Sequence, residues 1–244
     1  MPTRIAMWSG PRNISTAMMR SWGARPDTCA TDEPLYGRFL EVTGTDHPGR
    51  DEVVAQMETD YSAITSALTG PIPGGKAIWY QKHMAHHILD GDWDDLAWLD
   101  GLTNCMLIRD PGEMITSYIE VIPNPTTEDL GLPQQQRLAE VIAQRTGGHP
   151  PVLDARDVLE DPRRALSALC EHAQVAFDES MLSWPPGPRP EDGVWGKWWY
   201  ANVWKSTGFA PYQPKRATVP ARLRDIERRC RDIYERLREH RIGR

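Results

Sequence analysis

The sequence predicts an α/β fold in three layers, with a parallel sheet of about five strands between layers of helices. Short apolar runs typical of strands recur at residues 5–8, 28–31, 77–83, 104–108 and 152–155, with helical patterns between them. Helices that connect successive strands imply a parallel sheet. Polar residues lie at or directly after the ends of three of these runs, at 10–16, 82–83 and 109. They would meet at the carboxyl-terminal edge of the sheet, where such folds bind ligands.

The length, composition and net charge are those of a folded, single-domain globular protein. The 244 residues are enough for one domain with a well-buried core, and no repeat or long linker divides them, so we expect a single domain over 1–244. Hydrophobic residues make up 40% and charged residues 25%, which is typical of a folded globular protein. The net charge of −6 disfavours nucleic acid or an anionic membrane as the main partner.

Cysteine usage and hydropathy indicate a reducing compartment. Cys29, Cys105, Cys170 and Cys230 lie far apart without metal-site spacing, so we expect buried free thiols. The first apolar run is too short for a secretion signal and meets Arg12 at once. No run of 18 apolar residues exists, so no membrane span is expected. We therefore expect a soluble, cytoplasmic protein.

The stretch from Ile5 to Trp22 predicts an anion site. An apolar run turns at a Ser-Gly-Pro sequence and continues as a helix, which surrounds an anion with backbone N–H groups and a helix N-terminus. Ser15 and Thr16 offer hydroxyls to phosphate or sulfate oxygens, and Arg12 adds forked donors. The alternative is an ordinary capped turn. The Gly-Lys-Ser/Thr end of a Walker loop is absent, which disfavours a magnesium-dependent kinase.

Two further segments follow predicted strands. Glu33, in the sequence Asp-Glu-Pro-Leu-Tyr, would lie at the ligand-binding edge of the sheet, although a helix start is an equal alternative. Residues 51–68 show one amphipathic helical pattern. Near the third strand, three histidines lie within residues 83–87, but the ligand set for a metal is incomplete. His83 is the better candidate for a catalytic base, against the alternative of a solvated or capping histidine.

The run 104–108 is the clearest buried strand, and a helix opens directly after it. Asp110 is the expected N-cap, with Pro111 at the first helical position. Arg109 stands at the exit of the strand, and Ser117 lies two turns into the helix. An ion pair of Arg109 with Asp110 or Glu113 is the alternative to a binding role.

Two of these segments resemble signatures of the P-loop sulfotransferase family. The sequence Pro-Arg-Asn-Ile-Ser-Thr at 11–16 is similar to the family's 5′-phosphosulfate loop, with Arg12 in place of its lysine. The sequence Leu-Ile-Arg-Asp-Pro-Gly-Glu-Met-Ile-Thr-Ser-Tyr at 107–118 resembles its second signature. The resemblance implies a P-loop-type fold and a sulfotransferase that uses 3′-phosphoadenosine 5′-phosphosulfate and needs no metal. A nucleotide-binding protein without transfer activity is the alternative.

The resemblance also implies residue roles. The donor's 5′-phosphosulfate would contact the loop residues Gly10, Pro11, Arg12, Asn13, Ile14, Ser15 and Thr16. Its 3′-phosphate would contact Arg109 and Ser117. Lys82 would neutralise the leaving oxygen, and His83 would take the acceptor's proton, with His86 and Glu33 as rivals. The small-molecule acceptor is unidentified, and Glu33, Tyr36 and His86 are candidates to contact it.

Two C-terminal segments carry weaker predictions. Residues 195–209 are rich in tryptophan, and in the family a late loop covers the adenine and the 3′-phosphate, a role implied here for Lys205 and Ser206. The alternative is an amphipathic helix packed on the body of the protein. A last helix over 220–241 is dense in arginine and is a candidate surface for a homodimer.

Overall fold

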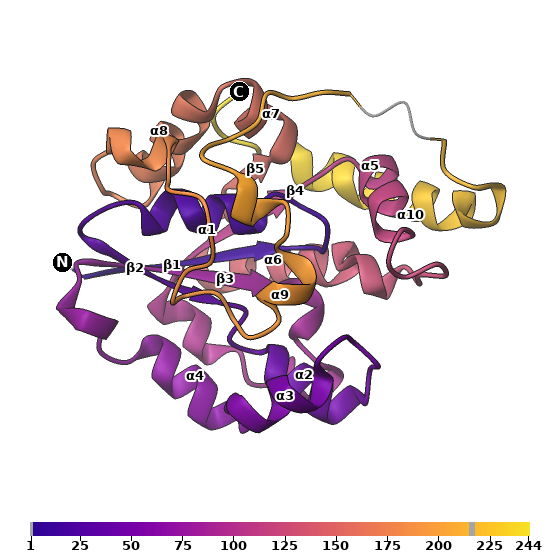
Figure 1. Cartoon of the computed structure of the whole chain (residues 1–244), viewed down its shortest axis with the longest axis horizontal. Coiled ribbons are helices and arrows are strands. Elements are labelled where there is room, and N and C mark those ends of the chain that lie inside the picture. The colour runs from indigo at the N-terminus through magenta and orange to yellow at the C-terminus, as the bar shows by residue number, and fades with distance from the viewer. Residues whose placement is uncertain (1, 215–217) are drawn as a thin grey trace.

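The computed structural model describes residues 2–214 and 218–244. A five-stranded, fully parallel sheet in the order β2-β3-β1-β4-β5 crosses the centre of the molecule (Figure 1), which confirms the predicted α/β class. The strands are β1 (Thr3–Ser9), β2 (Thr28–Asp32), β3 (Ile78–Met84), β4 (Thr103–Ile108) and β5 (Val152–Asp154). Each agrees within a few residues with an apolar run of the sequence.

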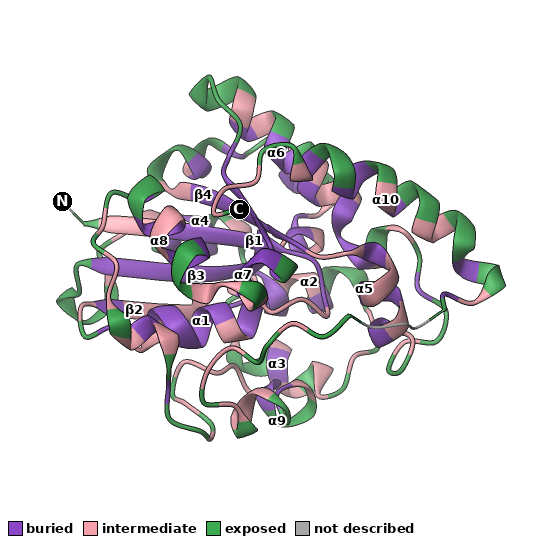
Figure 2. Cartoon of the chain, turned by 90° about the horizontal axis from the view of Figure 1, so that it is seen from above, coloured by how far each residue is buried: buried purple, intermediate pink, exposed green. Residues whose placement is uncertain are grey.

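Helices cover both faces of the sheet, so that the strands are the most buried part of the chain (Figure 2). One face packs against α1 (Ser15–Gly23), α7 (Ala155–Glu160) and α8 (Pro162–His172). The other face packs against α4 (Tyr61–Thr69), α5 (Pro111–Tyr118), α6 (Leu132–Thr146) and α10 (Arg224–Arg238). Side chains alternate between these faces along a strand, so neighbours in sequence enter different layers.

A smaller apolar cluster lies beside the sheet's ligand-binding edge. It packs α2 (Tyr36–Thr43) and α3 (Arg50–Gln56) against the C-terminal segment that contains α9 (Gly196–Trp199). The prediction of one helix over 51–68 is wrong, because α3 ends at Gln56 and a separate helix, α4, begins at Tyr61. Asp60 starts the second helix by accepting a hydrogen bond from the Ala63 N–H at 2.7 Å. The short polar side chain at this position favours an N-cap over a helix interior.

The expected start of α5 is confirmed. The Asp110 carboxylate accepts hydrogen bonds from the N–H groups of Gly112 and Glu113, and Pro111 takes the first helical position. This cap fixes the direction in which the helix leaves β4, and with it the place of Ser117. Among the described residues, no helix is both long and apolar enough to cross a membrane.

Candidate active site

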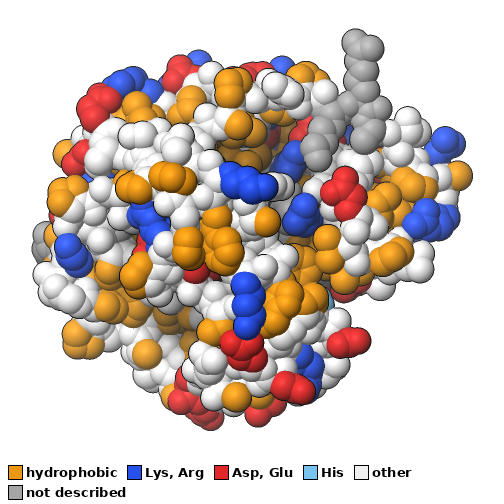
Figure 3. All heavy atoms as spheres, viewed as in Figure 1, with side chains coloured by type: hydrophobic (Ala, Val, Ile, Leu, Met, Phe, Trp, Pro, Cys, Tyr) orange, Lys and Arg blue, Asp and Glu red, His pale blue; other side chains and the backbone are white. Residues whose placement is uncertain are grey.

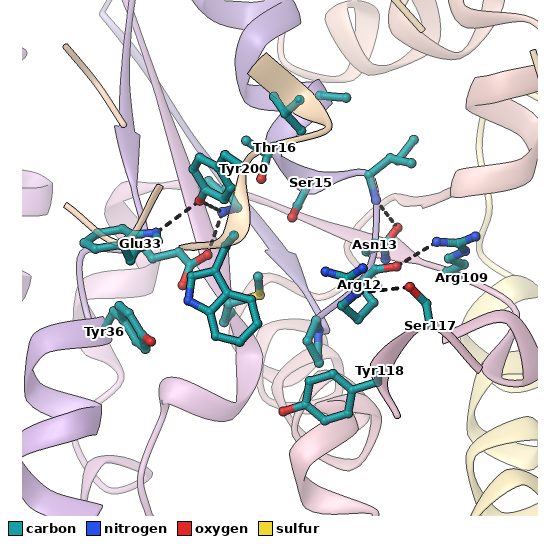
Figure 4. A pocket seen from close by; sticks show the side chains of 18 of the residues that line it. Arg12, Asn13, Ser15, Thr16, Glu33, Tyr36, Arg109, Ser117, Tyr118 and Tyr200 are labelled. Atoms are coloured by element: carbon teal, nitrogen blue, oxygen red, sulfur yellow. Dashed lines mark hydrogen bonds and ion pairs between the residues drawn. The ribbon is translucent and has the colours of Figure 1, made fainter. Parts of the chain in front are cut away.

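A cavity of about 410 Å³ opens at the carboxyl-terminal edge of the sheet, within the usual range of small-molecule sites. Its lining comes from the turn after β1, the ends of β2 and β3, the start and body of α5, and the segment around α9. Figure 4 shows two sides: Arg12, Arg109 and Ser117 lie together on one, and Glu33, Tyr36 and Tyr200 on the other. The predicted groups at 10–16, 82 and 109 therefore meet in one place.

The turn after β1 presents unused donors to this cavity. In α1, the N–H of Met18 is the first to bond a helical carbonyl, that of Ile14, so the N–H groups of residues 15–17 stay free in the described part of the chain. The hydroxyls of Ser15 and Thr16 also have no hydrogen-bond partner there. Asn13 holds the turn to β4 by donating to the Leu107 carbonyl at 3.0 Å. Such a set of donors at a helix N-terminus suits an anion.

The two predicted signatures are in direct contact. Arg12 Nε donates to Ser117 Oγ at 3.0 Å, and Arg109 Nη1 donates to the Arg12 carbonyl at 2.7 Å. Arg109 also pairs with the Glu113 carboxylate at 3.0 Å, so the ion pair considered from the sequence is present together with the cavity-lining position. Both guanidinium groups still have donors that no protein acceptor in the described residues uses, which leaves them able to bind an anion.

Lys82 lies at the floor of the cavity and is fully buried. Its ammonium donates to Asp32 Oδ1 at 2.8 Å, to Glu33 Oε1 at 2.6 Å and to the Tyr200 hydroxyl at 2.7 Å. Burial disfavours the charged amine, but the two carboxylates outweigh this and raise the pKa of Lys82 well above its ordinary value. An ammonium has three hydrogens, and all three are committed. This geometry does not support Lys82 as the group that neutralises a leaving oxygen.

Glu33 is the carboxylate of this cluster that faces the cavity. Its Oε1 is bonded to Lys82, whereas no donor in the described residues reaches Oε2. Burial raises the pKa of Glu33, and the nearby charge of Asp32 raises it further, against the lowering effect of Lys82. A carboxylate that is buried, open on one oxygen and raised in pKa is suited to accept a proton.

Much of the remaining wall is formed by aromatic rings. Rings of Tyr36, His87 and Trp199 line it, together with His47 and His86. Tyr36 stacks on His87 with ring centroids 5.1 Å apart, and its hydroxyl lies 3.0 Å from His47 Nδ1. Burial lowers the pKa of His86 to about 4, so its ring is neutral near pH 7. Tyr36 and His86 thus line the cavity, and their contact with an acceptor stays a prediction.

His83 does not reach the cavity, and the geometry does not support it as the base. Its ring stacks on Trp8 with centroids 4.2 Å apart and is almost completely buried in the opposite layer. The reason is strand alternation: Lys82 points toward the cavity, so its neighbour points away from it. Burial also lowers the pKa of His83 to about 3. A base must come within hydrogen-bond reach of its substrate, directly or through a water. The His83 ring instead packs against Trp8 and Trp98, outside the cavity lining.

Lys205 and Ser206 also fall outside the cavity lining, in contrast to the role implied for them. The Ser206 hydroxyl accepts from Trp184 Nε1 at 3.0 Å and donates to the Val203 carbonyl, so it caps the segment internally. The same segment instead contributes residues that the sequence did not single out individually, Tyr200 and Asn202. The density of tryptophans around them was the available signal, but it does not say which side chains turn inward. Gly10 likewise lies behind the lining, packed against Leu130.

The positive side chains visible on the surface do not form one large basic patch on the face shown in Figure 3. On the face shown in Figure 3, Lys and Arg side chains are scattered among hydrophobic and polar ones. Arg12 and Arg109 at the sheet edge are cationic lining groups with donors left free by the described residues, whereas the donors of Lys82 are all used by the protein. No group of three or more His, Cys, Asp or Glu side chains able to hold a metal occurs in the described part of the chain.

The chain is similar to known proteins both in sequence and in fold. A curated relative from Arabidopsis thaliana, branched-chain-amino-acid aminotransferase-like protein 1, is 38% identical over 240 residues, which are 98% of this chain. The chain spans only 42% of that relative's length, so the relative's name describes a much longer protein.

Two solved structures share the fold. A sulfotransferase from Alicyclobacillus acidocaldarius matches with a TM-score of 0.56 at 11% identity, covering 98% of this chain and 95% of that one. The sulfotransferase domain from the curacin biosynthetic pathway matches with a TM-score of 0.52 at 14% identity, covering 95% and 97%. The family of sequences described as the sulfotransferase domain matches residues 3–236. This match spans both signatures and the whole sheet, and the chain therefore belongs to the sulfotransferase family.

Proposed function

We propose that this sulfotransferase moves a sulfuryl group from 3′-phosphoadenosine 5′-phosphosulfate to a hydroxyl or amine of a small-molecule acceptor. The observation that carries the proposal is the contact between the two signatures, in which Arg12 donates to Ser117 at 3.0 Å and Arg109 to the Arg12 carbonyl at 2.7 Å. One ligand with two anionic groups would engage both segments at once.

The donor would be held without any metal. The free N–H groups of residues 15–17 and the hydroxyls of Ser15 and Thr16 suit the 5′-phosphosulfate, with Arg12 as the adjacent cation. Arg109 and Ser117 suit the 3′-phosphate, because a guanidinium and a hydroxyl both donate to phosphate oxygens. Arg109 would then share its charge between the phosphate and Glu113.

The proposed transfer forms one bond to sulfur and breaks another. The acceptor's oxygen or nitrogen forms a bond to sulfur as the bond from sulfur to the bridging oxygen breaks, and that electron pair leaves on the 5′-phosphate of the nucleotide. Charge spreads over the equatorial oxygens, so positioned donors are the protein's main contribution. The acceptor's proton goes to Glu33 Oε2, the open oxygen at the cavity floor. His86, neutral and in the lining, is the second candidate for this proton.

Isothermal titration with 3′-phosphoadenosine 5′-phosphate tests the donor assignment without an acceptor. Wild type should bind, and Arg109→Ala should weaken binding by roughly 10–100-fold, the effect of losing a charge-assisted hydrogen bond. The matched ligand is adenosine 5′-phosphate, for which the two proteins should differ little. Arg228→Ala, at an exposed position of α10, is the control protein. Absence of binding by wild type, or equal binding by Arg109→Ala, would refute the assignment.

Transfer itself is tested by incubating the donor with a panel of phenols, alcohols and amines and detecting sulfated products by mass spectrometry. Glu33→Gln should bind the nucleotide as wild type does and form product at least 100-fold more slowly, the usual range for loss of a general base. If His86→Asn shows the loss instead, the proton goes to His86. Nucleotide binding by wild type without product from any acceptor class would favour a binding protein that lacks transfer.

A further inference from the structure

The charged cluster at the cavity floor includes a residue from the far end of the chain. Tyr200 follows α9 directly, lies 118 positions after Lys82 and is 5% exposed. Its hydroxyl lies 2.7 Å from Lys82 Nζ, 3.1 Å from Trp195 Nε1 and 2.6 Å from Asp32 Oδ2. An ammonium and an indole N–H can only donate, so the hydroxyl accepts from both and gives its own hydrogen to Asp32.

The hydrogen bonds of the cluster can be counted atom by atom. Lys82 gives one hydrogen each to Asp32 Oδ1, Glu33 Oε1 and the Tyr200 hydroxyl. Asp32 therefore has a donor on both oxygens. Glu33 has a donor on one oxygen, and its other oxygen faces the cavity with no donor in the described residues. With Tyr200 neutral, two carboxylates and one ammonium leave a single negative charge.

We propose that Tyr200 is a positioning residue that commits Asp32 to Lys82 and thereby makes Glu33 the single carboxylate of the cluster that receives a proton. This inference rests on the proposed transfer reaction. It assigns to the aromatic segment around α9 a contribution to the chemistry: the hydroxyl that this segment inserts beneath the cavity decides which of two adjacent carboxylates acts.

Without this hydroxyl, Asp32 and Glu33 would each have one oxygen bonded to Lys82 and one oxygen without a donor in the described residues. Asp32 Oδ2 would lose its donor, and Lys82 would lose its uncharged acceptor. The groups that face Glu33 are Asp32 from β2, Lys82 from β3, Tyr200 beside α9 and Tyr36 from α2. None of them replaces the lost donor on Asp32. A proton entering the cluster would then have two competing sites, one on Asp32 and one on Glu33.

Carboxyl ¹³C NMR of the free protein tests this without an acceptor. The Glu33 and Asp32 signals are assigned by their loss in Glu33→Gln and Asp32→Asn. In wild type, we expect the Glu33 signal to titrate. In Tyr200→Phe, we expect the Glu33 midpoint to rise by roughly one pH unit, because the adjacent carboxylate loses its hydroxyl donor and its charge acts more strongly on Glu33. Tyr118→Phe, which removes another cavity-lining hydroxyl, should leave the Glu33 curve unchanged.

A second variant gives a shift of opposite sign. Asp32→Asn removes one negative charge and leaves Lys82 paired with Glu33 alone, so the Glu33 midpoint should fall. Near-UV circular dichroism checks folding, and if Tyr200→Phe does not fold, the Asp32→Asn shift decides. Unchanged curves in the folded variants would overturn the inference. Because nucleotide binding is measured separately, that result is distinct from failure of the proposed function, in which wild type neither binds the nucleotide nor transfers.

Discussion

The substitution Gly10→Ala should distort the turn after β1, residues 10–16, by adding a single carbon. A Cβ at Gly10 would lie 2.3 Å from the Leu130 carbonyl oxygen and 2.9 Å from the Met114 methyl. The methyl can turn away, but the carbonyl is backbone and cannot. Leu130 is fully buried, and the next residue, Gly131, accepts a hydrogen bond from Gln135 N–H at 2.9 Å as α6 begins. The loop therefore has to move rather than its neighbour.

The size of the effect follows from this overlap. The separation must increase from 2.3 Å to at least 3.0 Å, the shortest distance that real Cβ atoms show. Forcing a group into a packed interior costs about 1–3 kcal/mol. With a urea dependence of about 2–3 kcal/mol per molar for a chain of this size, the unfolding midpoint should fall by about 0.5–1 M. Binding of 3′-phosphoadenosine 5′-phosphate should weaken as well, because the displaced loop carries Arg12 and Ser15.

Gly91→Ala is the matched control for this experiment. Gly91 is exposed, and a Cβ there would meet no atom within 4 Å. Its urea midpoint and nucleotide affinity should equal those of wild type. If Gly10→Ala shows the same midpoint and affinity as this control, the close approach of the loop to Leu130 does not constrain the site, and the reasoning is refuted.

Two further predictions concern the supports of the site. Asp110→Ala should lower the free energy of unfolding by about 1–2 kcal/mol, because the side chain caps α5 and also accepts two hydrogen bonds from Arg231. Asp110→Asn should lower this free energy by less. Equal urea midpoints for wild type and Asp110→Ala would contradict the prediction. His83 has a folded-state pKa of about 3, below its ordinary value of about 6.5, so the unfolded chain binds more protons at intermediate pH. Stability should fall as the pH drops below about 6.5, by up to about 1.4 kcal/mol per pH unit for this group, and His83→Gln should show a shallower fall in urea midpoints measured between about pH 6.5 and 5.

The sequence was sufficient for the sheet and for the two signatures because both depend on local pattern. Each strand is a short apolar run followed by a turn, and parallel pairing brings the ends of such strands to one edge. Arg109 and Ser117 are joined by one capped helix, so their relative place follows from Asp110 and Pro111. Both lie in one short segment, which the resemblance to the second signature identified.

The remaining parts of the site depend on contacts that no local pattern contains. Whether Lys82 or His83 faces the cavity depends on which layer holds the acceptor, and period-two alternation offers both equally. Tyr200 contacts Lys82 although 118 positions of sequence separate them. Several aromatic side chains of this segment could have pointed into the cavity, and the sequence does not distinguish among them. Lys205 was chosen from the same segment and lies outside the cavity lining.

Backbone strain marks the two places where this site is held most tightly. Arg12 and Glu33 have positive φ values of 54° and 40°, which side chains rarely adopt, and such residues cost of order 1–3 kcal/mol each. Arg12 is held by the hydrogen bond from Arg109 to its carbonyl, and Glu33 by its N–H donating to the Lys82 carbonyl at 2.9 Å. Both restraints come from other strands' ends. The sheet edge thus fixes Arg12 and Glu33 before any ligand arrives. If they have the roles proposed above, this is the preorganisation that sulfuryl transfer requires.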